Sequence, residues 1–225
     1  MISNFLNLLQ LDASKIFPIY GTKISKDSFA KLDLSVSNPR IDSYDLSNLE
    51  QMNRLINDEL ESSGKSFGFG GYIEQRNWYR RNSSFTTGNE RDIHIGIDLW
   101  MPTGSEIFAP LEGTIHSFKD NDAIGDYGPT IILNHVINNQ SFHSLYGHLS
   151  RSSLRGLEVG QKISRAEKIG EIGDSVENTG WPTHIHFQLI IDMQNMSGDY
   201  PGVTSRNKLD EMKMNCPDPT PLASL

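Results

Sequence analysis

The chain has 225 residues, with 20 Lys and Arg against 28 Asp and Glu and a formal charge of -8 at pH 7. This length suits one compact domain with an appendage, and a composition of 36% hydrophobic and 21% charged residues is typical of folded rather than disordered proteins. The acidic balance removes the electrostatic reason to expect nucleic acid or an anionic membrane surface as a partner.

The apolar runs are far shorter than the roughly 20 residues that a membrane-spanning helix needs, so no span is expected. The start, MISNFLNLLQLDASK, lacks a basic region before its apolar run and a small-residue cleavage site. The sequence therefore predicts a cytoplasmic protein, or an exported one whose leader has been removed. A single cysteine, Cys216, excludes an intramolecular disulfide and a thiolate zinc cluster. A zinc ion would have to be bound by His and carboxylate.

Residues 1–66 contain no His and hold one convincing helix. Apolar residues at helical spacing predict this helix over residues 47–62, and Ser47 with Glu50 three residues later forms a capping-box signature. We expect the segment to be a small helical appendage whose apolar stripe packs on the sheet.

Residues 67–200 show short runs bounded by Gly, Pro, Asn or Asp, which is typical of an antiparallel sheet protein. The expected strands lie near 94–99, 105–109, 112–118, 130–137, 141–148, 161–163, 168–172 and 184–191. Asn138 and Asn139 suit a hairpin turn, because both side chains tolerate positive φ. Residues 201–225 carry four prolines, and we expect an extended strap without a further element.

All seven His lie in this strand-rich part, where three patterns stand out: His94-Ile-Gly-Ile-Asp98, Tyr146-Gly-His148-Leu149 and Thr183-His184-Ile-His186-Phe187. Residues two apart in a strand share a face, so His184 and His186 point the same way. Such a pair alone is more often two solvent-facing His. His94 and Asp98 also share a face, but a flat strand would hold them about 13 Å apart. One metal ion would therefore require a bend or bulge at Gly96, without which the motif is an incidental ion pair.

The three patterns together supply two His and one carboxylate for zinc, an open position for water, and two further imidazoles for proton transfer. Their order resembles that of the zinc endopeptidases of the lysostaphin and LytM type, a peptidoglycan-hydrolase family, over residues 91–189. The segments Ala109-Pro-Leu-Glu-Gly-Thr114 and Thr179-Gly-Trp-Pro182 add to the resemblance. It implies a bacterial metallopeptidase with a mainly β fold, an antiparallel sheet and barrel-sandwich hybrid of the duplicated hybrid motif.

The resemblance also implies the roles of individual residues. Zn²⁺ would be bound by His94, Asp98 and His186. We favour His184 as the general base and His148 as the partner of the developing oxyanion. The remaining imidazoles match none of these roles, and we interpret them as surface or structural: His116, His135 and His143.

The implied activity is hydrolysis of peptide bonds, of the peptidoglycan cross-link type, so the expected partner is a peptide or a peptidoglycan fragment. Loops at 120–127 and 177–181 would wall the substrate groove, with Tyr127 and Trp181 lining it. Because members of this family can carry a segment that covers the groove and places a side chain on the metal, the resemblance also suggests that residues 1–66 do so through an Asn, Asp or Glu from residues 38–58. Two positions depart from the family's usual form. Gly147 stands where an Ala is common, and Gln188 stands where a Glu often follows the last His.

Two alternatives stay open. Phosphocarrier domains of sugar permeases resemble the same hybrid of short hairpins and use two facing His, but Asp98 beside a phosphohistidine would repel the phosphate. The other alternative is a catalytically inert metal-binding scaffold of the same fold. No residue argues for it, because all five positions of the motif set are present.

Overall fold

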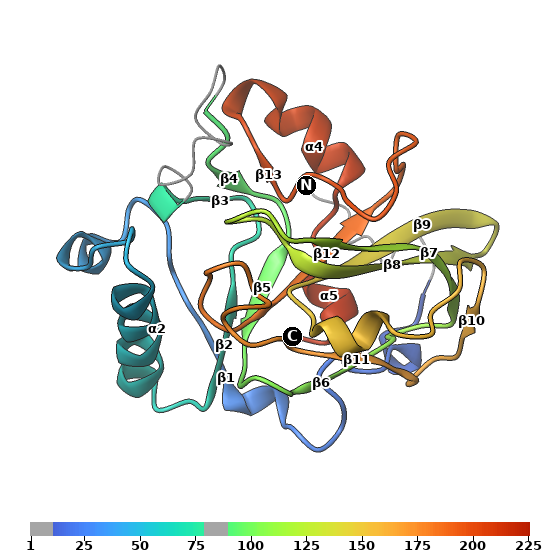
Figure 1. Ribbon diagram of the computed structural model, residues 1–225, viewed down its shortest axis with the longest axis horizontal. Helices are drawn as coiled ribbons and strands as arrows, with labels where there is room; N and C mark the ends of the chain where they lie inside the picture. Colours follow the sequence, from blue (N-terminus) through green and yellow to red (C-terminus); the bar gives the residue numbers. More distant parts are fainter. Residues whose placement is uncertain (1–10, 79–89) are drawn as a thin grey trace.

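The computed structural model describes residues 11–78 and 90–225. Its largest element is an eight-stranded sheet with the strand order β1-β2-β5-β12-β9-β8-β7-β10. In that order the strands comprise Phe29–Lys31, Phe67–Gly70, Ile97–Trp100, Ile185–Ile190, Gln140–Gly147, Gly128–Ile137, Gly113–Asn121 and Lys162–Ile163. Neighbours are antiparallel except β1 and β2, which are parallel. The mainly β, antiparallel fold predicted from the sequence is confirmed (Figure 1).

Two smaller sheets flank the large one. One pairs β6 (Glu106–Phe108) with β11 (Lys168–Glu171). The other has the order β13-β4-β3 and comprises Val203–Thr204, Ile93–His94 and Glu74–Gln75. Because β4 belongs to this small sheet and β5 to the large one, the chain changes sheet within two residues.

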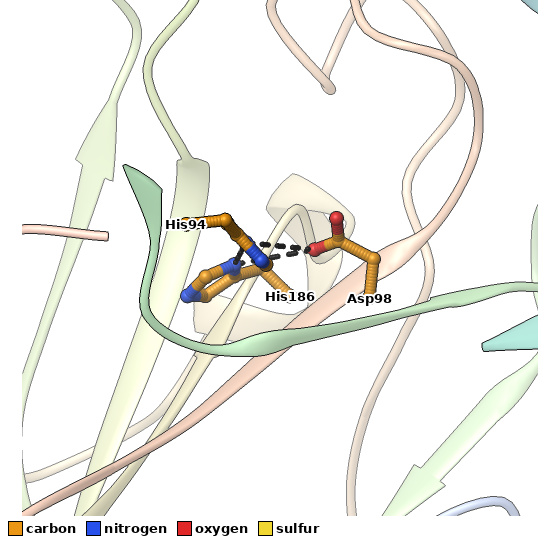
Figure 2. Close-up of side chains that lie close together, drawn as sticks. All are labelled: His94, Asp98 and His186. Carbon is orange, nitrogen blue, oxygen red and sulfur yellow. Dashed lines mark hydrogen bonds and ion pairs between the residues drawn. The ribbon is translucent and has the colours of Figure 1, made fainter. Parts of the chain in front are cut away.

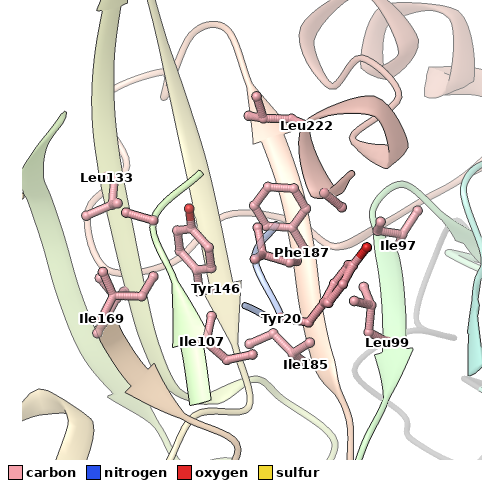
Figure 3. Packing of buried hydrophobic residues seen from close by; sticks show 14 of the residues in the cluster. Tyr20, Ile97, Leu99, Ile107, Leu133, Tyr146, Ile169, Ile185, Phe187 and Leu222 are labelled. Atoms are coloured by element: carbon pink, nitrogen blue, oxygen red, sulfur yellow. The ribbon is translucent and has the colours of Figure 1, made fainter. Parts of the chain in front are cut away.

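The largest hydrophobic cluster lies on one face of the large sheet, and a smaller one that includes Ile132, Leu145 and Ile190 lies on the other. The period-two alternation of the strands decides which face a side chain occupies. On β12, the core receives Ile185, Phe187 and Leu189 (Figure 3). Residues of the other parity, His186 and Gln188, face away from this core, as strand geometry requires. The strand is therefore anchored by its apolar residues and presents its polar residues on the opposite side.

The predicted helix is present as α2 (Leu49–Ser63), and its C-cap Gly64 has a φ of 65°. The capping box at Ser47 is wrong by one residue. Asn48 is the N-cap, since its side chain accepts hydrogen bonds from the Glu50 and Gln51 amides. The buried residues of α2 join a second apolar cluster that includes Trp78, Trp100 and Trp181. The expected packing of the helical stripe against the sheet is thus found.

The N-terminal segment also belongs to the main sheet, because β1 pairs with β2 and Ile19 and Tyr20 enter the main core. The expectation of an extended C-terminal strap is wrong. Residues 201–225 contain β13 and two short helices, α4 (Leu209–Asn215) and α5 (Thr220–Ala223). Proline occupies the first turn of α5, where the missing N–H costs no helical hydrogen bond.

Further turns complete the chain. Short 3-10 segments lie at Ala13–Lys15, Lys26–Ser28, Pro39–Ser43, Arg151–Leu154 and Arg206–Lys208. The expected hairpin turn is confirmed, since Asn138 and Asn139 have φ of 49° and 64° and join β8 to β9. Over the part of the chain that the structure describes, no helix combines the length and apolar character needed to cross a bilayer.

Candidate metal centre

The bend expected at Gly96 is present and brings His94 beside Asp98. The chain leaves β4 at His94 and enters β5 at Ile97, and the His94 Nε2 to Asp98 Oδ1 distance is 3.4 Å. The bend needs glycine, because a Cβ at position 96 would lie 2.6 Å from the His186 imidazole. On the neighbouring strand, His186 is paired directly with Asp98.

The side chains of His94, Asp98 and His186 converge on one point (Figure 2). His186 Nδ1 lies 2.9 Å from His94 Nε2 and 3.2 Å from Asp98 Oδ1. All three residues are buried, so the interpretation of the last His pair as solvent-facing does not hold. Ligands of a tetrahedral zinc ion with bonds near 2.1 Å stand about 3.4 Å apart, which is close to these separations.

Hydrogen bonds to the far ring nitrogens define the tautomers of the two imidazoles. His94 Nδ1 donates to the Gly71 carbonyl at 2.9 Å, and His186 Nε2 donates to Gln188 Oε1 at 2.9 Å. The Gln188 amide is oriented by its own donation to the Pro201 carbonyl at 3.1 Å. In neutral imidazoles the facing nitrogens therefore carry lone pairs. Two lone pairs and a carboxylate oxygen repel one another unless a cation lies among them, so the donor set fits a metal ion.

The second oxygen of Asp98 is held by a residue that sequence reasoning missed. Arg76 Nη1 donates to Asp98 Oδ2 at 2.6 Å, and Arg76 Nε pairs with Glu74 at 2.6 Å. Burial alone would raise the pKa of Asp98, but His94 and the Arg76 guanidinium hold that pKa well below its usual range. Burial lowers the pKa of His94 to about 4. Both groups are thus in their ligating protonation states at neutral pH.

His184 and His148 lie beside this cluster, with ring centroids 4.2 Å apart. His184 Nδ1 donates to the Pro182 carbonyl at 2.6 Å, which leaves a lone pair on Nε2, 3.7 Å from Asp98 Oδ1. His148 Nδ1 is buried and has no hydrogen-bond partner within the described residues. Burial lowers the pKa of both imidazoles. The five positions of the motif set are therefore assembled in one place.

A cavity of about 340 Å³ opens onto these imidazoles. Tyr127 and Trp181 line it, and residues 123–127 form part of its wall. Position 147 is glycine where alanine is common in the family, and the structure gives a steric reason: a Cβ there would lie 2.7 Å from the Tyr127 ring. The sequence pattern missed the wall formed by residues 199–203, because no motif marks those residues.

The comparison with protein families identifies the segment that carries this cluster. Residues 92–197 match Peptidase family M23. Residues 92–197 therefore belong to peptidase family M23. The segment is a metallopeptidase domain, a hydrolase, and we refer to it as the M23 domain. This membership and the position of Asp98 between two imidazoles disfavour the phosphocarrier alternative.

Relatives of the M23 domain are found among curated proteins. The chain is 28% identical over 145 residues to an uncharacterized metalloprotease of Haemophilus influenzae, covering 62% of this chain and 28% of that protein. It is 29% identical over 98 residues to the peptidoglycan DD-endopeptidase ShyA of Vibrio cholerae, covering 44% of this chain and 20% of that protein. The chain thus spans less than a third of the length of either relative.

A solved structure also resembles the M23 domain and its surroundings. The catalytic domain of the antimicrobial peptidase lysostaphin from Staphylococcus simulans aligns with a TM-score of 0.40 at 19% identity. That alignment covers 72% of this chain and 97% of the lysostaphin domain.

The hypothesis that residues 38–58 place a ligand on the metal of the M23 domain is not supported. Among the described residues, the cluster of convergent ligand atoms comprises only His94, Asp98 and His186. Among the described residues before position 90, Arg76 reaches the cluster, and this cation bonds to Asp98. No pattern in the sequence around Arg76 signals this contact.

Proposed function

We propose that the M23 domain is a zinc-dependent endopeptidase that hydrolyses peptide bonds of the peptidoglycan cross-link type. His94, Asp98 and His186 would hold the Zn²⁺. The observation that carries this proposal is the convergence of two unprotonated imidazole nitrogens and one carboxylate oxygen within 2.9 to 3.4 Å of one another. Three protein ligands with an adjoining cavity describe a catalytic rather than a structural zinc site.

When bound, zinc polarises a substrate carbonyl and lowers the pKa of water toward about 7. The protein's own residues hold the ligands in place. Gln188 and the Gly71 carbonyl fix the two ring orientations, and Arg76 fixes the Asp98 carboxylate. Such outer partners orient the ligands and raise their basicity.

His184 is suited to be the general base. Its Nδ1–H is committed to the Pro182 carbonyl, so Nε2 is the atom that accepts a proton from the attacking water. Trp100 stacks on the His184 ring, with centroids 6.2 Å apart, and holds it in this orientation. General-base catalysis of this kind typically contributes about 10²–10⁴-fold.

His148 is suited to stabilise the oxyanion that develops on the scissile carbonyl. Its imidazole lines the cavity beside His184, and its Nδ1 has no partner within the described residues. The backbone around it is rigid, because the His148 amide donates to the Tyr127 carbonyl at 2.7 Å. A donor already aimed at the site of charge development needs no reorganisation during reaction.

The proposed substrate class rests on the relatives and on the shape of the site. Two relatives, ShyA and ShyC of Vibrio cholerae, are peptidoglycan DD-endopeptidases. The cavity is bounded by aromatic side chains, among them Trp78, Trp181 and Tyr127, and by charged groups of both signs, Arg91 together with Asp126 and Asp199. Such a lining suits a peptide with apolar and carboxylate groups.

The test is digestion of purified cross-linked muropeptide dimers by the zinc-loaded full chain, followed by chromatography and mass spectrometry. We expect the wild type to release monomer products. The cleavage rates of His184→Ala and His148→Ala should be lower than the wild-type rate by at least about 10²-fold. Lys162→Ala changes an exposed side chain of β10, is the matched control and should cleave as the wild type does. Intact dimers after prolonged incubation with the wild type would overturn the proposed substrate class. If a generic peptide is cleaved under the same conditions, the proposed endopeptidase activity still holds.

Zinc content separates the ligand roles from the catalytic ones. His186→Ala should lose both zinc and activity, because it removes one of three ligands. His148→Ala should retain zinc and lose turnover. Equal loss of zinc in both variants would contradict the assignment.

A further inference from the structure

Two imidazoles outside the catalytic cluster meet on the outer face of the large sheet. His116 lies on β7 and His143 on β9, two strands that are separated by β8. Their ring centroids are 4.8 Å apart with an interplanar angle of 77°. His94 and His186, in the candidate metal centre, have the same arrangement, with a distance of 4.8 Å and an angle of 80°.

A β-bulge directs His116 toward its partner. The register between β7 and β8 shifts between Ile115 and Ser117, so His116 is the extra residue of the bulge. Bulges commonly re-aim a side chain at functional positions.

The polar surroundings resemble those of a ligating imidazole. His116 Nδ1 lies 2.8 Å from Ser117 Oγ, and that oxygen also accepts from the Gly198 amide at 2.8 Å. In the tautomer with the proton on Nδ1, this atom donates to Ser117 and Nε2 is the ligand atom, which is the usual pattern around a metal-bound His. His143 Nδ1 is buried and makes no hydrogen bond of normal geometry among the described residues, although the Ile190 and Ile191 carbonyls face this imidazole. Buried polar atoms without a partner are rare in native proteins.

Both imidazoles line a surface cavity that also contains a carboxylate. The cavity is lined by His116, His143, Asp192, Met193, Asn195 and Met196, among others. Asp192 Oδ1 accepts from the Gln194 amide at 2.8 Å, and the negative charge of this carboxylate acts on His143. Burial lowers the pKa of both imidazoles, which keeps them unprotonated at neutral pH. Imidazole nitrogens and a carboxylate oxygen are ligands that suit divalent ions such as Zn²⁺.

We propose that His116 and His143 form a second metal site, for a divalent transition-metal ion such as Zn²⁺, with Asp192 as an additional ligand. The site is separate from the catalytic cluster, yet Met196 lines both cavities. A metal ion here would bind beside a segment that also forms a wall of the catalytic groove.

The seven His leave few other places for a second zinc ion. Four belong to the catalytic centre, and His135 has both ring nitrogens bonded, to the Glu112 carbonyl and to Ser144 Oγ at 2.7 Å each. The His148 and His184 pair is the competing location. Variants of His116 and His143 distinguish the proposed site from the His148 and His184 pair.

The test is equilibrium dialysis of the full chain against Zn²⁺ alone, followed by elemental analysis. We expect two zinc ions per wild-type chain, one in His116→Gln or His143→Gln, one in His186→Ala, and none in the double variant His116→Gln with His186→Ala. Ser141→Ala, two residues from His143 on the same strand, is the matched control and should bind two. A melting curve for each variant shows that it is folded.

A wild-type chain that binds no more than one zinc ion would overturn the proposal. So would a second zinc ion retained in both His116→Gln and His143→Gln, which would place it on His148 and His184. Failure of the proposed endopeptidase activity would leave these stoichiometries unaffected, because the assay measures binding alone.

Discussion

Substitution of Gly96 by alanine tests the proposed ligand geometry of the metal centre, because the added methyl group would lie against one of the ligands. In Gly96→Ala, the new Cβ would stand 2.6 Å from the Cε1 and Nε2 atoms of His186 and 2.9 Å from the Phe187 carbonyl oxygen. Ordinary contact begins near 3.4 Å. The imidazole must therefore move by about 0.8 Å, since the carbonyl belongs to the ladder between β5 and β12 and cannot yield.

A displacement of this size is several times the tolerance of a zinc bond, which is about 0.2 Å. Movement of the ring also breaks its hydrogen bond to Gln188. Perturbing an outer partner alone typically lowers metal affinity by about 10–100-fold, so we expect a loss of at least that size. Overpacking should also lower the free energy of unfolding of the metal-free protein by about 1–3 kcal/mol.

Zinc affinity is measured by competition with a chromophoric chelator, and stability by urea denaturation of the metal-free chain. Gly156→Ala is the matched control. A Cβ there meets nothing within 4 Å, but the φ of 73° is strained for alanine. The control should lose about 1 kcal/mol of stability and keep its zinc affinity. Zinc affinity of wild-type strength in Gly96→Ala would refute the proposed ligand geometry.

Three further predictions follow from the same structure. Gln188→Leu removes the acceptor of the His186 Nε2–H and should lower zinc affinity by about 10–100-fold in chelator competition; unchanged affinity would show that Gln188 does not position the ligand. Burial lowers the pKa of His135 to about 4, below an ordinary value of about 6.5, so its contribution to stability is present above pH 6.5 and is lost as the pH falls toward 4. Urea denaturation should therefore show the wild type losing about 2 kcal/mol more than His135→Gln between pH 7 and 5, and equal losses would contradict this reasoning. Leu55→Ala should lower the free energy of unfolding by about 2–5 kcal/mol through the cavity left under α2, with zinc affinity unchanged; lost affinity would instead couple the helix to the metal centre.

Much of the fold and of the candidate site could be read from local patterns. The parity of His184 and His186, the requirement for a bend at Gly96 and the hairpin at Asn138 all depend on backbone geometry within a few residues. The same logic placed α2 correctly and misplaced its cap by one residue, because Ser47 and Asn48 are both good caps. The C-terminal helices were missed because prolines were taken as breakers, although the first turn of a helix accepts them.

The sequence by itself determined the fold class and the set of chemically active residues. Only the tertiary structure decided that Arg76 bonds to Asp98, that Gln188 connects His186 to the Pro201 carbonyl, and that His116 meets His143. The contacts of Arg76 with Asp98, of Gln188 with Pro201 and of His116 with His143 join different elements, and they depend on how the strands are arranged in the sheets and on one bulge. Side-chain periodicity specifies which face a residue occupies, but strand order specifies which other residue faces it.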